Sequence, residues 1–125
     1  MHTVRKRVVD GIEEYLPLPA SVMHILVALA DGEKHGYAIM RDVVDVSGGA
    51  VRMGSGTLYG SIKRMLEQGL IEEADERPDP ALDDQRRRYY RLTALGQRVG
   101  AAEQARLAAL VDAARLRRLG LSGAW

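Results

Sequence analysis

Apolar residues recur along the chain at the spacing of amphipathic helices, and the first such series occupies the N-terminus. Its apolar positions lie four residues apart, at Val4, Val8, Ile12 and Leu16. Basic residues 5–7 cover the other side, and Pro17 and Pro19 end the series because proline breaks a helix. A lone amphipathic helix of this length is marginally stable in water, so we expect it to pack against a partner surface.

Three shorter helices are predicted next. Ser21 is expected to cap the first of them. The second opens at residues 35–37 and is stopped by the serine and two glycines of residues 47–49. The third runs from about Gly54 to Gln68, and Gly69 supplies its left-handed stop. The face of this third helix that we expect to be buried is formed by Leu58, Ile62, Met65 and Leu66.

After these helices the pattern changes to that of a short β-hairpin. Residues 70–74 begin a strand, and residues 88–93 alternate in the manner of a second one. The two prolines within residues 78–80 forbid regular structure, so we expect a long loop between the strands. Thr93 is then expected to cap a last helix over residues 94–119, which is rich in Ala and Leu and carries two offset apolar stripes.

This order of elements indicates a mainly α fold with a small β-hairpin, the winged helix-turn-helix, flanked by terminal helices. We expect an N-terminal dimerisation helix over residues 1–16, a winged domain over 17–93, and a C-terminal dimerisation helix with a tail over 94–125. Both end helices carry more apolar surface than one small domain can cover. The residues expected in the dimer interface are Val4, Val8, Ile12, Val99, Ala102, Leu107, Leu110, Val111 and Ala114.

Composition narrows the class of protein. A length of 125 residues fits one domain, and 46% hydrophobic residues can supply its core. The absence of Cys excludes disulfides, zinc–cysteine sites and thiol catalysis. No apolar run is long enough to cross a bilayer, and the basic N-terminus lacks the apolar core of a secretion signal, so we expect a soluble cytoplasmic protein without a membrane partner. Frequent Arg and rare Lys point to a GC-rich bacterial genome.

Enzymatic chemistry finds little support in the sequence. None of the three histidines, His2, His24 and His35, has metal-ligand spacing with a second His or a carboxylate. Residues 54–57 are Gly-rich but lack the Lys of a phosphate-binding loop, and Ser55 has no evident base partner. We therefore expect neither an enzyme nor a bound metal or cofactor.

Charge is distributed unevenly along the chain, although the net charge is only +1. Residues 52–66 carry three cations and no acid, and residues 86–91 carry four arginines. Residues 67–84, between these segments, are strongly acidic. Local basic patches of this kind are typical of nucleic-acid contact even when the total charge is near zero.

The outward face of the helix over 54–68 is small, polar and basic. A helix that enters a major groove needs short side chains for close approach and cations for guanine edges and phosphates. We expect Thr57, Ser61, Lys63 and Arg64 to read or grip the groove, with Gly60 permitting close approach. Taken alone, this helix fits equally well an ordinary solvated face with a tolerated glycine.

Two further segments are candidates for contact with the DNA backbone. Residues 86–88 would lie on the wing, although charges on an edge strand also serve to prevent aggregation. His35 and Tyr37 lie at a helix N-terminus, where free amides favour anions, although a cap with a packed Tyr explains them equally well. The full set of expected DNA-binding residues is His35, Tyr37, Ser55, Thr57, Tyr59, Gly60, Ser61, Lys63, Arg64, Arg86, Arg87 and Arg88.

Four short blocks in this chain resemble the PadR family of transcriptional regulators. They are His35–Ile39 at a helix opening, Gly56–Tyr59 at the start of the recognition helix, Leu66–Ile71 at the turn into the wing, and Arg87–Thr93, followed by Gly96, in the return strand. Gly54-Ser55 stands where members often have Ser-Pro. The single C-terminal helix resembles that of the short-form subgroup.

The resemblance implies a homodimer that binds double-stranded DNA sequence-specifically, usually as a repressor. The implied partners are a near-palindromic operator, a second copy of the chain and, as in some members, a small aromatic effector bound between the subunits. A two-fold dimer would place its recognition helices about 34 Å apart. Two alternatives stay open: a winged-helix protein-interaction module without salt-sensitive DNA affinity, and a dimeric small-molecule sensor, which the scarcity of aromatic residues disfavours.

Overall fold

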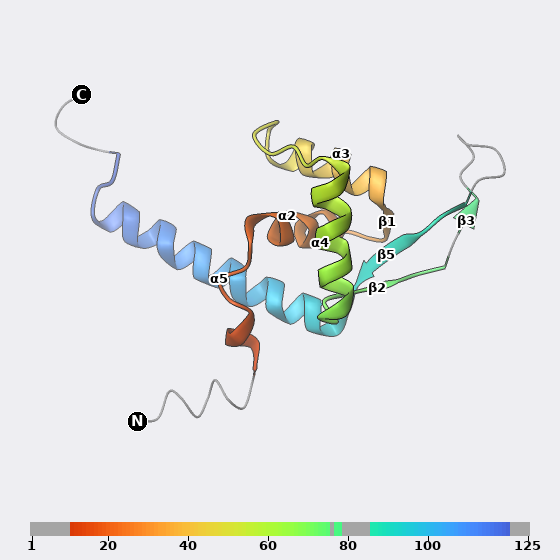
Figure 1. The fold of residues 1–125 in the computed structure, drawn as a ribbon. Helices are drawn as coiled ribbons and strands as arrows, with labels where there is room; N and C mark the ends of the chain where they lie inside the picture. The colour runs from red at the N-terminus through yellow and green to blue at the C-terminus, as the bar shows by residue number, and fades with distance from the viewer. Residues whose placement is uncertain (1–10, 76, 79–85, 121–125) are drawn as a thin grey trace.

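The computed structural model describes residues 11–75, 77–78 and 86–120. In this part of the chain, the helices pack together and a small antiparallel sheet extends from one side of them (Figure 1), so the predicted mainly helical winged fold is confirmed. The elements in chain order are the 3-10 helix η1 (Ile12–Tyr15), α2 (Ala20–Leu29), β1 (Lys34–His35), α3 (Gly36–Val46), α4 (Ser55–Glu67), β2 (Ile71–Glu73), β3 (Arg77–Pro78), β4 (Arg86–Arg87), β5 (Tyr89–Leu92) and α5 (Ala94–Leu116).

The N-terminal segment differs from its prediction. From Gly11 onward it contains only the single turn η1 instead of a continuous helix up to residue 16. Ile12 is 8% exposed and belongs to the core, so it is already covered by its own chain rather than open to a second one. Its expected place in the dimer interface is therefore wrong. Val4 and Val8 lie outside the described residues.

α2 begins after Pro19, which occupies the N-cap position. Proline has no amide hydrogen and a fixed φ, so the helix starts directly behind it. Ser21 consequently lies inside the helix, and its predicted role as a cap is wrong. Its side chain instead reaches α4, where the Ser21 Oγ is 3.3 Å from the Ser61 Oγ.

The sheet has three strands where the sequence predicted two. Its order is β1–β5–β2, with β5 in the middle and both pairings antiparallel. Ile71 lies opposite Leu92, and Lys34 lies opposite Tyr90. β1 was missed because two residues directly before a helix are too few to show an alternating pattern.

The wing continues beyond the main sheet as a second pair of strands. β3 and β4 are antiparallel, with Arg77 opposite Arg87 and Pro78 opposite Arg86. Pro78 therefore lies in a strand, contrary to the predicted irregular loop. Proline is tolerated at the edge of a sheet, where its missing amide hydrogen is not needed for pairing.

α5 begins where the sequence predicted and ends at Leu116, slightly earlier than expected. The Thr93 Oγ1 caps it by accepting a hydrogen bond from the Gly96 amide at 2.9 Å. The first half of the helix packs under the winged domain, and the second half extends away from it (Figure 1). Among the described helices, none has the length and apolar content that crossing a bilayer requires.

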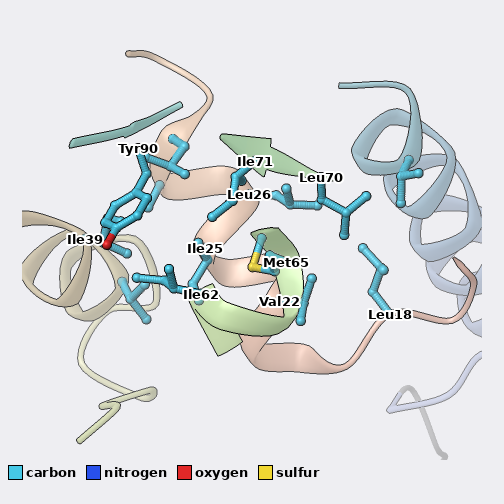
Figure 2. Packing of buried hydrophobic residues seen from close by; sticks show 14 of the residues in the cluster. Leu18, Val22, Ile25, Leu26, Ile39, Ile62, Met65, Leu70, Ile71 and Tyr90 are labelled. Atoms are coloured by element: carbon cyan, nitrogen blue, oxygen red, sulfur yellow. The ribbon is translucent and has the colours of Figure 1, made fainter. Parts of the chain in front are cut away.

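The hydrophobic core fixes α4 against α2, α3 and the sheet. Ile25 of α2 lies beside Ile62 and Met65 of α4 at the centre of Figure 2. Burying an aliphatic side chain of this size contributes about 1.5–3 kcal/mol, so this cluster holds α4 in one orientation. The fully buried apolar side chains are Ile25, Ala28, Ile39, Val43, Leu58, Met65, Leu70 and Val99.

Candidate nucleic-acid interface

α4 presents the polar and basic face that the sequence predicted. Its apolar residues point into the core, with Leu58 and Met65 fully buried and Ile62 2% exposed. No acid precedes Glu67 in the helix. Gly60 is half-buried, and the exposed residues on the outer side are Ser55, Thr57, Tyr59, Lys63 and Arg64. The composition of this face suits a major groove, and contact with DNA stays a prediction.

Ser61 does not belong to the outer face. Its exposed fraction is 0%, because it lies in the same i, i+3, i+4, i+7 stripe as Leu58 and Met65. The hydroxyl groups of Ser61 and Ser21 share a hydrogen bond across the contact between α4 and α2. The prediction that Ser61 grips the groove is therefore wrong: its short side chain packs the two helices together.

Arg64 is exposed, but its guanidinium turns back along α4. The Arg64 Nη2 donates a hydrogen bond to the Ser61 Oγ at 3.4 Å. The side chain also lines a polar hollow of about 370 Å³ together with Glu14, Tyr15 and Gln68. To reach a base edge, Arg64 has to release this contact and extend from the helix.

His35 caps α3 and joins it to the sheet. The His35 Nδ1 accepts a hydrogen bond from the Ala38 amide at 3.2 Å. Its ring meets the ring of Tyr89 edge-on, with 5.4 Å between centroids and 84° between planes. His35 is half-buried in this arrangement. The capping role left open by the sequence is thus present, and a phosphate contact by His35 stays a prediction.

Tyr59 of α4 lies across the backbone at the start of α3. A Cβ on Gly36 would be 2.2 Å from the Tyr59 Oη and 2.7 Å from its Cζ. Gly36 is therefore needed for the two helices to come this close, because any side chain would displace the ring. Tyr37 and Tyr59 are each 49% exposed, so both keep surface available to a partner beside this junction.

The described arginines of the wing are paired with acids of β2 and with Glu33, which directly precedes β1. The Arg88 Nη1 lies 3.2 Å from the Glu73 Oε2. Arg91 donates to Glu72 at 2.8 Å and to Glu33 at 3.2 Å, and these hydrogen bonds raise the pKa of Arg91. For Arg86 and Arg87 the structure describes the strand but not the side chains, so their predicted contacts fall outside the described residues.

The cations of the winged domain divide into two groups. In the first group, on the sheet, Lys34 pairs with Asp31 and Asp42. Arg88 pairs with Glu73, and Arg91 pairs with Glu72. In the helix-turn-helix, no carboxylate of the described residues pairs with Arg41, Arg52, Lys63 or Arg64. Arg41 and Arg52 had no predicted role in the site, because the order of charges along the chain does not reveal which carboxylates pair with other cations.

α5 carries most of the surface that was predicted for a dimer interface. Leu107, Leu110 and Val111 are 37%, 59% and 49% exposed, and Ala114 is half-buried. Val99 is fully buried, so its expected place in that interface is wrong. Ala102 packs partly against the same core. The difference arises because the first half of α5 covers its own winged domain.

Glu103 of α5 is a buried carboxylate that the sequence did not single out. It is 2% exposed and accepts a hydrogen bond from the Leu18 amide at 3.2 Å. Arg106 donates two hydrogen bonds to it, at 2.6 and 2.9 Å. The hydrogen bonds from Arg106 and Leu18 hold the pKa of Glu103 below its usual value. Glu103 thus fastens the chain before α2 to α5.

A small hollow of about 140 Å³ lies between α2 and α5. Apolar residues including Met23, Leu26 and Leu92 line it, together with Gln97 and Gln104. Such a lining suits a small, mostly apolar molecule with a polar group. Within the described part of the chain, no cluster of three or more His, Asp or Glu is arranged to hold a metal ion.

Several solved regulators share this fold. A PadR family transcriptional regulator from Eggerthella lenta is 25% identical, with a TM-score of 0.63, over 94% of this chain and 93% of that one. A transcriptional regulator from Clostridium thermocellum is 22% identical, with a TM-score of 0.64, over 85% of this chain and 92% of that one. Bacillus subtilis PadR, solved in complex with operator DNA, is 20% identical, with a TM-score of 0.58, over 71% of this chain and 47% of that one.

One relative matches this chain over a short stretch, and one family model matches it over a longer one. An uncharacterized 37.1 kDa protein in transposon TN4556 of Streptomyces fradiae is 44% identical over 55 residues. That match takes in 44% of this chain, which spans only 15% of the length of that relative. The transcriptional regulator PadR-like family matches residues 25–102, from the middle of α2 to the first half of α5. The match includes more than half of the residues, and the chain therefore belongs to the PadR-like family of transcriptional regulators.

Proposed function

We propose that this chain binds double-stranded DNA sequence-specifically, as a cytoplasmic homodimeric repressor that a small-molecule effector releases. The observation that carries the proposal is the outer face of α4, which is polar, basic and without an acid before Glu67. The cations of the helix-turn-helix have no carboxylate partner among the described residues, so they are available to DNA phosphates.

In this proposal α4 enters the major groove. Thr57 and Lys63 approach base edges and phosphates directly, and Arg64 does so after releasing Ser61. Tyr37, Tyr59 and the wing arginines 86–88 contact the backbone on either side of the groove. The Bacillus subtilis relative, solved in complex with operator DNA, supports DNA binding by the shared fold.

Pairing of two chains would occur through the second half of α5. Leu110 and Ala114 lie on the same face of α5 as Val99 and Glu103, which are buried in the first half of the helix. Beyond the winged domain Ala114 is half-buried, but Leu110 is 59% exposed, which supports a second copy as the partner of this face. Two-fold pairing would present two α4 helices to a near-palindromic operator.

Release by an effector would act through the hollow between α2 and α5. The 140 Å³ hollow between α2 and α5 supports it, because it is comparable to a cavity that holds benzene. A small aromatic molecule there would contact both the winged domain and the helix that we assign to dimerisation. It would shift DNA affinity only if it bound the two arrangements of these elements with different affinity.

The test is a titration of the full chain, by fluorescence anisotropy, with duplex from upstream of its own gene and with a scrambled duplex, at two salt concentrations. We expect tighter binding to the upstream duplex and a strong decrease of affinity with salt. Arg64→Ala should weaken binding to the upstream duplex more than to the scrambled one, by about 1–3 kcal/mol. Absence of salt-sensitive affinity for either duplex would reject the proposal and favour a protein-interaction module.

A further inference from the structure

Arg41 lies one turn after Tyr37 on α3 and rests on its ring. The Arg41 Cζ is 5.4 Å from the centroid of the Tyr37 ring, a cation–π arrangement. Arg41 is exposed, and Tyr37 is 49% exposed. The ring therefore limits the freedom of the guanidinium while leaving its hydrogen-bond donors open to solvent.

The acids near Arg41 in the sequence do not neutralise it. The Asp42 carboxylate lies 3.5 Å from the Lys34 Nζ, which ties it to β1. Asp45, one turn further along α3, is exposed, but within the described part of the chain no ion pair joins it to Arg41. Arg41 thus keeps an unpaired positive charge on a helix that carries acids.

α4 also has a tyrosine that is followed one turn later by a basic residue. Lys63 follows Tyr59 by one turn, and both are exposed. The Tyr59 ring lies over Gly36, directly before Tyr37, so the two tyrosines, and the cations one turn after each of them, belong to neighbouring parts of α3 and α4. A surface that joins two aromatic hydroxyls to two unpaired cations is complementary to the oxygens of a phosphate backbone.

We propose that Arg41, held over Tyr37, is a further DNA-contacting residue that binds a backbone phosphate beside the groove entered by α4. This inference rests on the proposed function. α3 is the first helix of the helix-turn-helix, the element that crosses the backbone rather than reading bases, so the contact is independent of sequence. Guanidinium is suited to it because it can stack on a ring and donate to phosphate at the same time, which an ammonium group does less well.

The experiment measures binding of the full chain to a mixed-sequence duplex over a salt series, so no operator needs to be known. Arg41→Ala should weaken binding several-fold and lower the slope of log K against log salt by about 0.9 for each phosphate that Arg41 neutralises. Arg41→Lys should keep the slope and reduce the affinity less. Arg98→Ala removes an exposed arginine of α5 and serves as the charge-matched control, with no change expected in the slope.

The outcomes separate this inference from the proposed function. If the unmodified chain shows no salt-dependent binding to duplex, the proposed function itself fails. If the unmodified chain binds and Arg41→Ala keeps its slope, Arg41 is not a phosphate ligand. An equal fall in slope for Arg98→Ala would overturn the inference as well, because net charge alone would then explain the effect. Unfolding curves should be alike for all variants, since the substituted side chains are exposed.

Discussion

The backbone of Gly96 in α5 touches the carbonyl group of Leu70 at the start of the wing. A Cβ on Gly96 would lie 2.0 Å from the Leu70 carbonyl oxygen and 3.0 Å from its carbonyl carbon. Thr93 strengthens the same junction, because its hydroxyl donates to the Gly69 carbonyl oxygen at 2.6 Å. This contact fixes the direction in which α5 leaves the winged domain, and with it the position of any partner bound to its second half.

Gly96→Ala is expected to lower the free energy of unfolding by about 1–3 kcal/mol, because the atom it meets is backbone and cannot rotate aside. Gly100→Ala is the matched control, since its Cβ would meet the Leu26 Cδ1 at an ordinary 3.7 Å. Alanine also favours a helix over glycine by about 1 kcal/mol, so the control should be neutral or stabilising. Chemical denaturation measures both, and equal decreases in stability would contradict the close contact at Gly96.

Ser61 and Thr57 should separate stability from DNA binding. Ser61→Ala removes one partner of the hydroxyl pair between α2 and α4, so we expect stability to fall by about 1 kcal/mol. DNA affinity should not fall, because Arg64 then has no Ser61 contact to release. Thr57→Ala lies on the exposed face and should weaken binding to duplex without affecting unfolding. Denaturation curves and anisotropy titrations measure the two effects. Selective loss of binding in Ser61→Ala would return Ser61 to the set of DNA-binding residues.

The ion pair between Glu73 and Arg88 is expected to compete with DNA for the wing arginine. An exposed pair of this kind contributes at most about 1 kcal/mol, so Glu73→Gln should tighten binding to duplex by up to about fivefold. Glu72→Gln makes the same change in net charge, but its partner Arg91 keeps Glu33. The control should therefore show a smaller increase in affinity. Equal increases in the two variants would mean that overall charge, and not the loss of the ion pair between Glu73 and Arg88, sets the effect.

Glu103 should make stability depend on pH in the acidic range. Its pKa in the folded chain is lower than the ordinary value of 4.5, so its contribution is present above that value and is lost as the pH falls through the folded pKa. Glu103→Ala should cost about 1–3 kcal/mol at neutral pH, because the buried Leu18 amide loses its acceptor. Glu103→Gln keeps an acceptor and should cost less. Denaturation across and below pH 4.5 should show a weaker pH dependence for Glu103→Gln than for the unmodified chain, and identical dependence would argue against a paired carboxylate.

Leu110→Asp should yield folded monomers if the second half of α5 pairs two chains. Leu110 is 59% exposed, so a charge there is tolerated in one chain but disfavoured in an apolar interface. Ala105→Asp places the same charge on another exposed position of α5, outside the stripe that contains Leu110, and should leave the association state unchanged. Sedimentation velocity reports the association state and circular dichroism reports the fold. A Leu110→Asp protein that associates like the unmodified chain would move the interface elsewhere.

The local spacing of apolar residues was sufficient to predict most of the helices. The four-residue and three-residue spacing of Leu58, Ile62 and Met65 predicts which side of α4 is buried, because a helix places such residues on one face whatever surrounds it. The Thr93 cap and the stop at Gly69, where φ is 77°, also depend only on neighbouring residues and were predicted. The candidate DNA-binding face of α4 followed from the same periodicity, apart from Ser61.

Contacts between distant parts of the chain decided the rest. Ser61 is buried because a serine of α2 faces it, and Glu103 is buried because it accepts the Leu18 amide, 85 residues away. The strand β1 exists only through its pairing with β5, and the division of cations into paired and unpaired groups depends on which strands and helices lie side by side. Apart from η1, the sequence alone determined where the helices form and which way their apolar sides face, since those follow from local spacing. Only the tertiary structure decided which polar groups are engaged with one another and which are left for a partner, because that depends on distances in space that the order of residues does not contain.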